Sequence, residues 1–176
     1  MGLLSSFTIL LTMATFKHLN GGNVQSKRVI VENGYPAASA TQAIEIEQPA
    51  NSQIVGGHFR TLEAVTIANT GEVGISVGKT AGATDIFNGG TDVIADDVSG
   101  ATSLPANFFL NFATATGMTA SQFSTGDSAS PLASDGYTEE ARTVHITVSS
   151  DVTITLGTGE TGKYEVQLDF KMLGSE

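Results

Sequence analysis

Gly78-Lys79-Thr80 is the stretch of this sequence whose residue types come closest to a nucleotide-binding motif. A phosphate-binding loop needs Gly-x4-Gly-Lys-Ser/Thr, so that backbone N–H groups surround the phosphates and a helix follows at once. The first glycine of that pattern would fall at position 73, which is Val73, and the residues after Thr80 are "AGATDIFNGG". These are turn residues and not a helix start. The stretch therefore predicts a strand that ends in a glycine turn, without a nucleotide cofactor.

The histidines and serines do not form a recognisable catalytic or zinc motif. His18, His58 and His145 lie far apart, each without a second ligand at the i+2 or i+4 position. The chain has no cysteine, no tryptophan and no G-x-S-x-G nucleophile elbow. His145 alternates with Thr143 and Thr147, which predicts an outward-facing position, exposed to solvent or at an interface. We expect neither an enzyme nor a zinc site.

One carboxylate cluster is close enough in sequence to suggest a cation. Carboxylates in loops bind hard cations, but the spacing here matches no calcium loop of the D-x-D-x-D-G type. A solvated acidic face is the simpler interpretation, and cation binding by residues 85–97 stays open. The cluster consists of Asp85, Asp92, Asp96 and Asp97.

Charge is distributed unevenly along the 176 residues. The chain carries 18 acidic and 8 basic residues, a formal net charge of −10, which repels a phosphate backbone and predicts no nucleic-acid partner. From Met1 to Val31 the only charges are basic, whereas from Thr80 to Ala141 there is no lysine or arginine. That middle segment contains eight acids: Asp85, Asp92, Asp96, Asp97, Asp127, Asp135, Glu139 and Glu140.

Alternation of apolar and polar residues predicts strands along most of the chain. In residues 41–48, Ile44 and Ile46 alternate with glutamates, so one face is buried. Residues 52–69 are interrupted by Gly56-Gly57, which predicts two strands or one strand bent by a bulge. Further strands are expected at 27–32 and 74–78, and three more near the C-terminus, around 143–148, 152–156 and 164–171, are expected to form an antiparallel meander.

These elements predict an all-β fold: an antiparallel β-sandwich or jelly roll with an extended N-terminal arm. The arm is placed at residues 1–26 and the domain at residues 27–176. The arm contains "GLLSSFTILLTMATF", which is similar to the apolar part of a signal peptide, but no basic residue precedes it. It is too short and too polar to span a bilayer, and no membrane partner is expected. A myristoylation pattern at Gly2 and a translation start at Met13 remain alternatives.

Two segments resemble small β-rich structural proteins of tailed-phage virions, in particular head decoration or cement proteins. They are "IVGGHFRTLEAVTIANTGEVGISVGKTAGATDIF" at 54–87 and "VTITLGTGETGKYEVQLDFKML" at 152–173. In such proteins a glycine-punctuated strand precedes a variable middle, and a T-x-T-x-G-x-x-T-x-G-K strand closes the domain. Their motifs consist of strand and turn residues, and residues 1–26 lie outside the matched part.

The resemblance implies a non-enzymatic module, without a cofactor, that binds the major capsid protein on the outer surface of the capsid, often as a homotrimer. A tail-associated or receptor-binding adhesion module and a secreted bacterial surface or pilus-type β-sandwich subunit are the alternatives. We expect the apolar, weakly basic arm to anchor the protein, and the acidic loops to face solvent or a basic partner. The candidate capsid or subunit contacts are Leu10, Leu11, Phe16, Lys17, Lys27, Arg28, Phe108 and Phe109.

Overall fold

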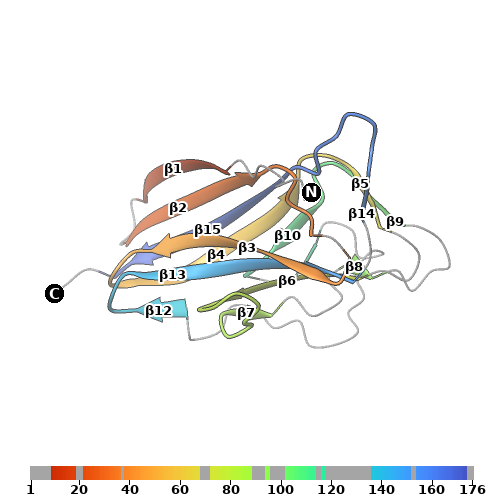
Figure 1. The fold of residues 1–176 in the computed structure, drawn as a ribbon. Helices are drawn as coiled ribbons and strands as arrows, with labels where there is room; N and C mark the ends of the chain where they lie inside the picture. The colour runs from red at the N-terminus through yellow and green to blue at the C-terminus, as the bar shows by residue number, and fades with distance from the viewer. Residues whose placement is uncertain are drawn as a thin grey trace.

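The structure is a computed structural model that describes residues 9–18, 22–36, 38–67, 72–88, 94–95, 102–113, 116–117, 136–151 and 154–173. The described residues form antiparallel strands without a helix. The strands make two main sheets, which lie as two layers in Figure 1, and a small third sheet at one end. The expected all-β, antiparallel sandwich is thus confirmed.

The first layer is a seven-stranded sheet with β15 near its centre. Its order is β1 (Ile9–His18), β2 (Gly22–Val31), β15 (Tyr164–Met172), β4 (Ser52–Thr61), β10 (Phe109–Asn111) and β11 (Thr116–Gly117), and β12 (Tyr137–Thr138) also pairs with β4.

The second layer is a five-stranded sheet. Its order is β3 (Ala40–Gln48), β13 (Arg142–Ser150), β6 (Glu72–Gly78) and β7 (Phe87–Asn88), and β8 (Ile94–Ala95) also pairs with β6. The third sheet consists of β14 (Ile154–Leu156), β5 (Val65–Ile67) and β9 (Thr102–Leu104).

The core is formed by the inward faces of the two layers, as the alternation predicts. Ile44 and Ile46 are buried while Glu45 and Glu47, which alternate with them, are exposed. Aromatic rings connect the layers: Phe87 of the second sheet lies 4.8 Å, centroid to centroid, from Phe112, which follows β10 of the first. Each large apolar side chain buried in this way contributes roughly 1.5–3 kcal/mol. The largest fully buried side chains are Tyr164, Phe59, Phe87, Phe112 and Phe170.

The diglycine in β4 marks a bulge. Asp169 of β15 is opposite Gly56, but the next residue, Phe170, is opposite Ile54, so Val55 is the extra residue and is 39% exposed. Gly57 has φ of +152°, and a Cβ there would lie 2.3 Å from the carbonyl oxygen of Gln167. Glycine is therefore required where β4 bends. Both expectations for residues 52–69 hold in part, because β4 is one bulged strand and β5 is a second strand.

The predicted C-terminal meander is wrong. The strands β13, β14 and β15 do form near the expected residues, but each belongs to a different sheet. β13 pairs with β3 and β6, β14 with β5, and β15 with β2 and β4. Alternation specifies which face of a strand is buried, but it does not specify the neighbouring strand.

The N-terminal region is paired with the sheet. β1 pairs with β2 along its whole length, from Ile9 opposite Val31 to His18 opposite Gly22. The boundary placed between residues 26 and 27 lies inside β2.

A single carboxylate holds the loop that leads into β15. Glu63 Oε2 accepts hydrogen bonds from the backbone N–H of Thr161 at 2.7 Å and of Lys163 at 3.1 Å. Burial raises the pKa of Glu63, but these hydrogen bonds and the Lys163 ammonium outweigh burial and hold the pKa below its ordinary value of 4.5. The Lys163 ammonium also lies 2.8 Å from Glu32, which raises the pKa of Lys163. The carboxylate form of Glu63 is therefore the form that stabilises the fold.

We predict that Glu63→Ala lowers the free energy of unfolding by about 1–3 kcal/mol at neutral pH, because two backbone donors lose a charged acceptor. Since the folded state lowers this pKa, the contribution is complete above pH 4.5 and is lost as pH falls through the folded-state pKa. Urea unfolding from pH 7 to pH 3 measures the effect. Glu140→Ala, which removes an exposed carboxylate, is the control. A wild-type advantage that persists undiminished at pH 3 would contradict the assignment.

Candidate functional site

A buried carboxylate lies on the outer face of the seven-stranded sheet. Glu165 stands between the buried core residues Tyr164 and Val166, so its side chain points away from the core, yet the residue is only 3% exposed. Cationic and polar groups cover it. His58 Nε2 lies 2.9 Å from Oε1, and Arg28 Nη1 and Arg60 Nη2 lie 3.3 and 3.7 Å from Oε2. We refer to Glu165, His58, Arg28 and Arg60 as the Glu165 cluster.

The strand register brings this cluster together. Glu165 of β15 is directly opposite Arg60 of β4, and Gln167, two residues further along, is opposite Arg28 on one side and His58 on the other. Arg28 and His58 are therefore diagonal neighbours of Glu165, within reach of long side chains. The bulge at Val55 lies beyond this region, so the register is regular across the cluster.

The cluster carries more positive than negative charge. Two guanidinium groups and a histidine share one carboxylate, which offsets the cost of taking that carboxylate out of water. The Arg28 and Arg60 side chains remain 41% and 37% exposed. Arg60 Nε is buried and has no hydrogen-bond partner in the described part of the chain. The two guanidinium groups thus keep N–H donors that Glu165 does not use, and such donors suit a carboxylate or phosphate.

The neighbours of the cluster are partly apolar. The ring of Phe109 lies 4.7 Å from the His58 ring, centroid to centroid, and is half-buried. Further along β15, Asp169 accepts hydrogen bonds from Ser26 Oγ at 2.5 Å and Gln167 Nε2 at 2.8 Å. The Ser26 hydroxyl is thereby bonded to Asp169 and the His58 ring to Glu165, so the arrangement resembles a recognition surface more than a nucleophile–base pair.

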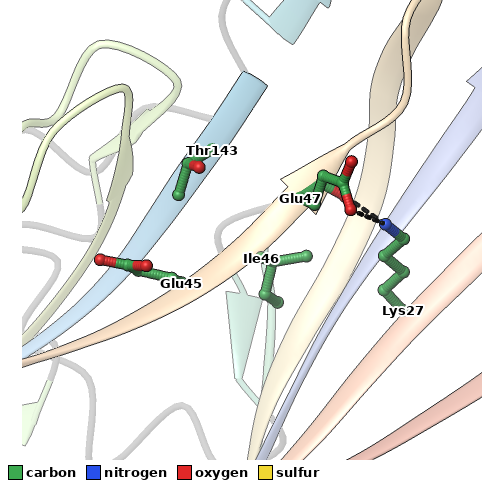
Figure 2. Close-up of a pocket in the computed structure, with 5 residues that line it drawn as sticks. All are labelled: Lys27, Glu45, Ile46, Glu47 and Thr143. Carbon is green, nitrogen blue, oxygen red and sulfur yellow. Dashed lines mark hydrogen bonds and ion pairs between the residues drawn. The ribbon is translucent and has the colours of Figure 1, made fainter. Parts of the chain in front are cut away.

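A shallow pocket of about 250 Å³ lies beside the edge of the five-stranded sheet, and Figure 2 shows its lining residues. The ammonium of Lys27, from β2, donates to the backbone carbonyl of Glu47 at 2.7 Å and lies 3.7 Å from the Glu47 carboxylate. Because β3 is an edge strand, this ammonium occupies an acceptor that an incoming strand would need. The pocket is lined by Lys27, Glu45, Ile46, Glu47 and Thr143.

The edge of the other sheet is different. β1 pairs with β2 on one side, and among the described residues no strand pairs with its other side. Figure 1 shows β1 at the margin of its layer. Its sequence, ILLTMATFKH, has no proline and no acidic residue. The two sheet edges therefore differ, one carrying an inward-pointing lysine and the other an unpaired row of backbone groups.

The structure distributes the candidate contact residues over several places. Arg28 belongs to the Glu165 cluster, and Phe109 lies beside it. Lys27 forms the bridge to β3 and is only 8% exposed, so the contact expected through its side chain is wrong. Phe108 is a correction: it is 2% exposed and part of the core, so its side chain is not available to another subunit. The four N-terminal candidates, Leu10, Leu11, Phe16 and Lys17, lie in β1.

Other motifs from the sequence have simple structural explanations. β6 ends at Gly78 and an exposed turn follows, which confirms the predicted strand and glycine turn. Lys79 pairs with Asp85, with 3.5 Å between Nζ and Oδ2. Of the acidic cluster only Asp85 is described; Asp92, Asp96 and Asp97 lie outside the described residues, within which no three potential metal ligands gather.

His145 is half-buried on β13, opposite Glu45 and Gly78. Its Nδ1 is buried without a hydrogen-bond partner in the described structure.

Sequence reasoning did not identify Glu165. It is one of several polar residues that alternate along residues 164–171, and its distinguishing property, burial by three side chains from β2 and β4, depends on strand pairing. The sequence signal that could have indicated this cluster is the position of Arg28, His58 and Arg60, which alternate with buried residues in two strands.

Comparison of the chain with protein-family models, curated proteins and solved structures gives no match. In the described structure there is no helix with the length and apolar character needed to cross a membrane.

We predict that Glu165→Ala lowers the free energy of unfolding by about 1–3 kcal/mol, because it leaves His58 and two guanidinium groups without their shared acceptor. The exposure of the arginines keeps the loss below that of a fully buried pair. Glu47→Ala, which removes a carboxylate that is 73% exposed, is the matched control and should cost less than about 1 kcal/mol. Equal effects of the two variants in denaturant unfolding would show that the buried cluster does not stabilise the fold.

Proposed function

We propose that this protein is a non-enzymatic structural protein of a tailed-phage virion that decorates the outer surface of the capsid and cements neighbouring subunits of the major capsid protein. The observation that carries the proposal is the edge of β1 with which none of the described strands pairs. A ten-residue edge strand offers alternating backbone N–H and C=O groups to a further strand. A protein that must hold subunits together without chemistry needs such an extended surface.

The contrast between the edge strands β1 and β3 supports strand addition at β1 over strand addition at β3. Lys27 occupies a carbonyl of β3, which is one way in which proteins discourage pairing at an edge. β1 carries only Lys17 and His18 as basic residues, at its far end, and is uncharged elsewhere. An added strand from a capsid subunit would pair with the backbone of β1, and the contacts expected at Leu10, Leu11, Phe16 and Lys17 fall in this strand.

The strand order also supports this class of protein. The chain passes from one layer to the other in the sequence β2, β3, β4, β6, and later β10, β13, β15. We interpret the resulting orders, β2-β15-β4-β10 and β3-β13-β6-β7, as the two four-stranded sheets of a jelly roll. Jelly rolls occur in viral capsid proteins as well as in lectins, and this fold analogy is in keeping with the proposal.

The open edge suits a second class as well. Pilus-type subunits join by strand addition at a sheet edge, so a secreted bacterial β-sandwich subunit would use the same strand. A tail-associated adhesion module would present its loops instead. Electron microscopy of the native particle separates these possibilities, because only the decoration protein lies on the capsid shell.

We predict that deletion of residues 1–19, which removes β1, abolishes decoration of purified capsids while leaving cooperative thermal unfolding, because β2, β15 and β4 remain paired with one another. Occupancy is counted from cryo-electron micrographs or from gel densitometry of sedimented particles. Full occupancy by the deletion variant would rule out β1 as the anchor.

A pair of proline variants tests the edge without removing the strand. Thr12 and Met13 are consecutive in β1, so their N–H groups point to opposite edges. Proline at one position removes a hydrogen bond to β2 and lowers the Tm; proline at the other removes a donor from the open edge. The variant that keeps the wild-type Tm should lose decoration at least about tenfold, which corresponds to about 1.4 kcal/mol. Unchanged decoration by that variant contradicts strand addition.

A further inference from the structure

A second surface of this protein is suited to binding carboxylates. The chain has three arginines, and two of them, Arg28 and Arg60, converge on one carboxylate of the outer sheet face. Glu165 holds both guanidinium groups in place while more than a third of each side chain stays exposed. A pair of arginines fixed in this way loses little conformational freedom when it binds a carboxylate. The half-buried ring of Phe109 adds an apolar neighbour.

The matching acidic group is present on the same chain. Glu139 and Glu140 are consecutive, exposed and without an ion pair in the described structure. They follow Tyr137, which is 41% exposed and one of four exposed large apolar side chains among the residues whose burial is described. Two carboxylates beside an exposed aromatic ring complement two guanidinium groups beside a half-buried aromatic ring.

The two groups cannot meet within one molecule. β12, which contains Tyr137, pairs with Gln53 and Ser52 at one end of β4. Arg60 lies near the other end of β4, seven residues further along, which is about 24 Å in an extended strand. A contact between these arginines and glutamates therefore joins two copies, either in a two-fold dimer that makes the contact twice or head to tail in a ring or filament.

We propose that the Glu165 cluster is a carboxylate-binding site for Glu139 and Glu140 of a second copy of this chain. The inference deepens the proposed function, because contact between copies would build the homo-oligomer expected of a decoration protein. The arginines bind the carboxylates, and the Phe109 and Tyr137 rings pack beside them. The contact is electrostatic at its centre, so it weakens as salt screens the charges.

Charge reversal on each side tests the proposal. Sedimentation velocity of the purified full chain, without capsids, should show self-association that weakens with added salt. Arg28→Glu with Arg60→Glu, and separately Glu139→Arg with Glu140→Arg, should each raise the dissociation constant at least about 30-fold, and an equimolar mixture of the two variants should recover association. Lys171→Gln is the matched control: an exposed cation on the same strand as Glu165, about 20 Å away, whose loss should change nothing.

A conservative pair of substitutions tests the same contact if the charge-reversal variants fold poorly. Arg28→Lys with Arg60→Lys keeps both positive charges beside Glu165 and removes the two-donor geometry, so it should fold and still associate more weakly. The glutamate variants change exposed residues and should unfold at the wild-type temperature.

A wild-type chain that stays monomeric at its highest soluble concentration, or variants that associate like the wild type, would overturn the proposal. If the wild-type protein decorates capsids but the arginine variants self-associate as the wild type does, only this inference is refuted. Salt-sensitive, arginine-dependent association of a protein that is absent from the capsid shell would refute only the proposed function.

Discussion

The pairing of β15 between β2 and β4 is the interaction on which most of this structure depends. Both backbone edges of β15 are bonded, over eight residues to β2 and nine to β4. One face supplies Tyr164, Val166, Leu168 and Phe170 to the core, where each is fully buried. The other face supplies Glu165, Gln167 and Asp169 to the polar outer surface. A shift of one residue in this register would exchange the two faces, so the core and the candidate site are specified together.

The same strand explains why a carboxylate can be buried on an outer face. Glu165 is covered by side chains that come from strands on both of its sides, which only a central strand permits. At a sheet edge such a residue would have neighbours on one side only and would remain in water. Glu47, on the edge strand β3, shows this: its carboxylate is 73% exposed and its one cationic neighbour, Lys27, approaches from the other sheet.

Interaction surfaces and core are therefore built from a small set of long strands. β1 leaves an unpaired edge in the described structure, and β3 carries the Lys27 bridge. The outer face formed by β2, β15 and β4 presents the two arginines. The acidic residues that could meet these arginines lie at the far end of β4, on the corner after β12. This separation of opposite charges along one molecule is what makes contacts between copies physically reasonable.

The sequence by itself determined the elements and their buried faces. Alternation in residues 41–48 and 164–171 identifies the residues that enter the core, and Gly56-Gly57 marks the bulge, because the pleat and the backbone requirement of glycine are local properties. The tertiary structure alone decided which strands are neighbours. It placed β13, β14 and β15 in three sheets instead of one meander, put Phe108 in the core, and covered Glu165 with side chains from β2 and β4. Strand pairing joins residues more than a hundred positions apart, and a period of two along the chain carries no information about that choice.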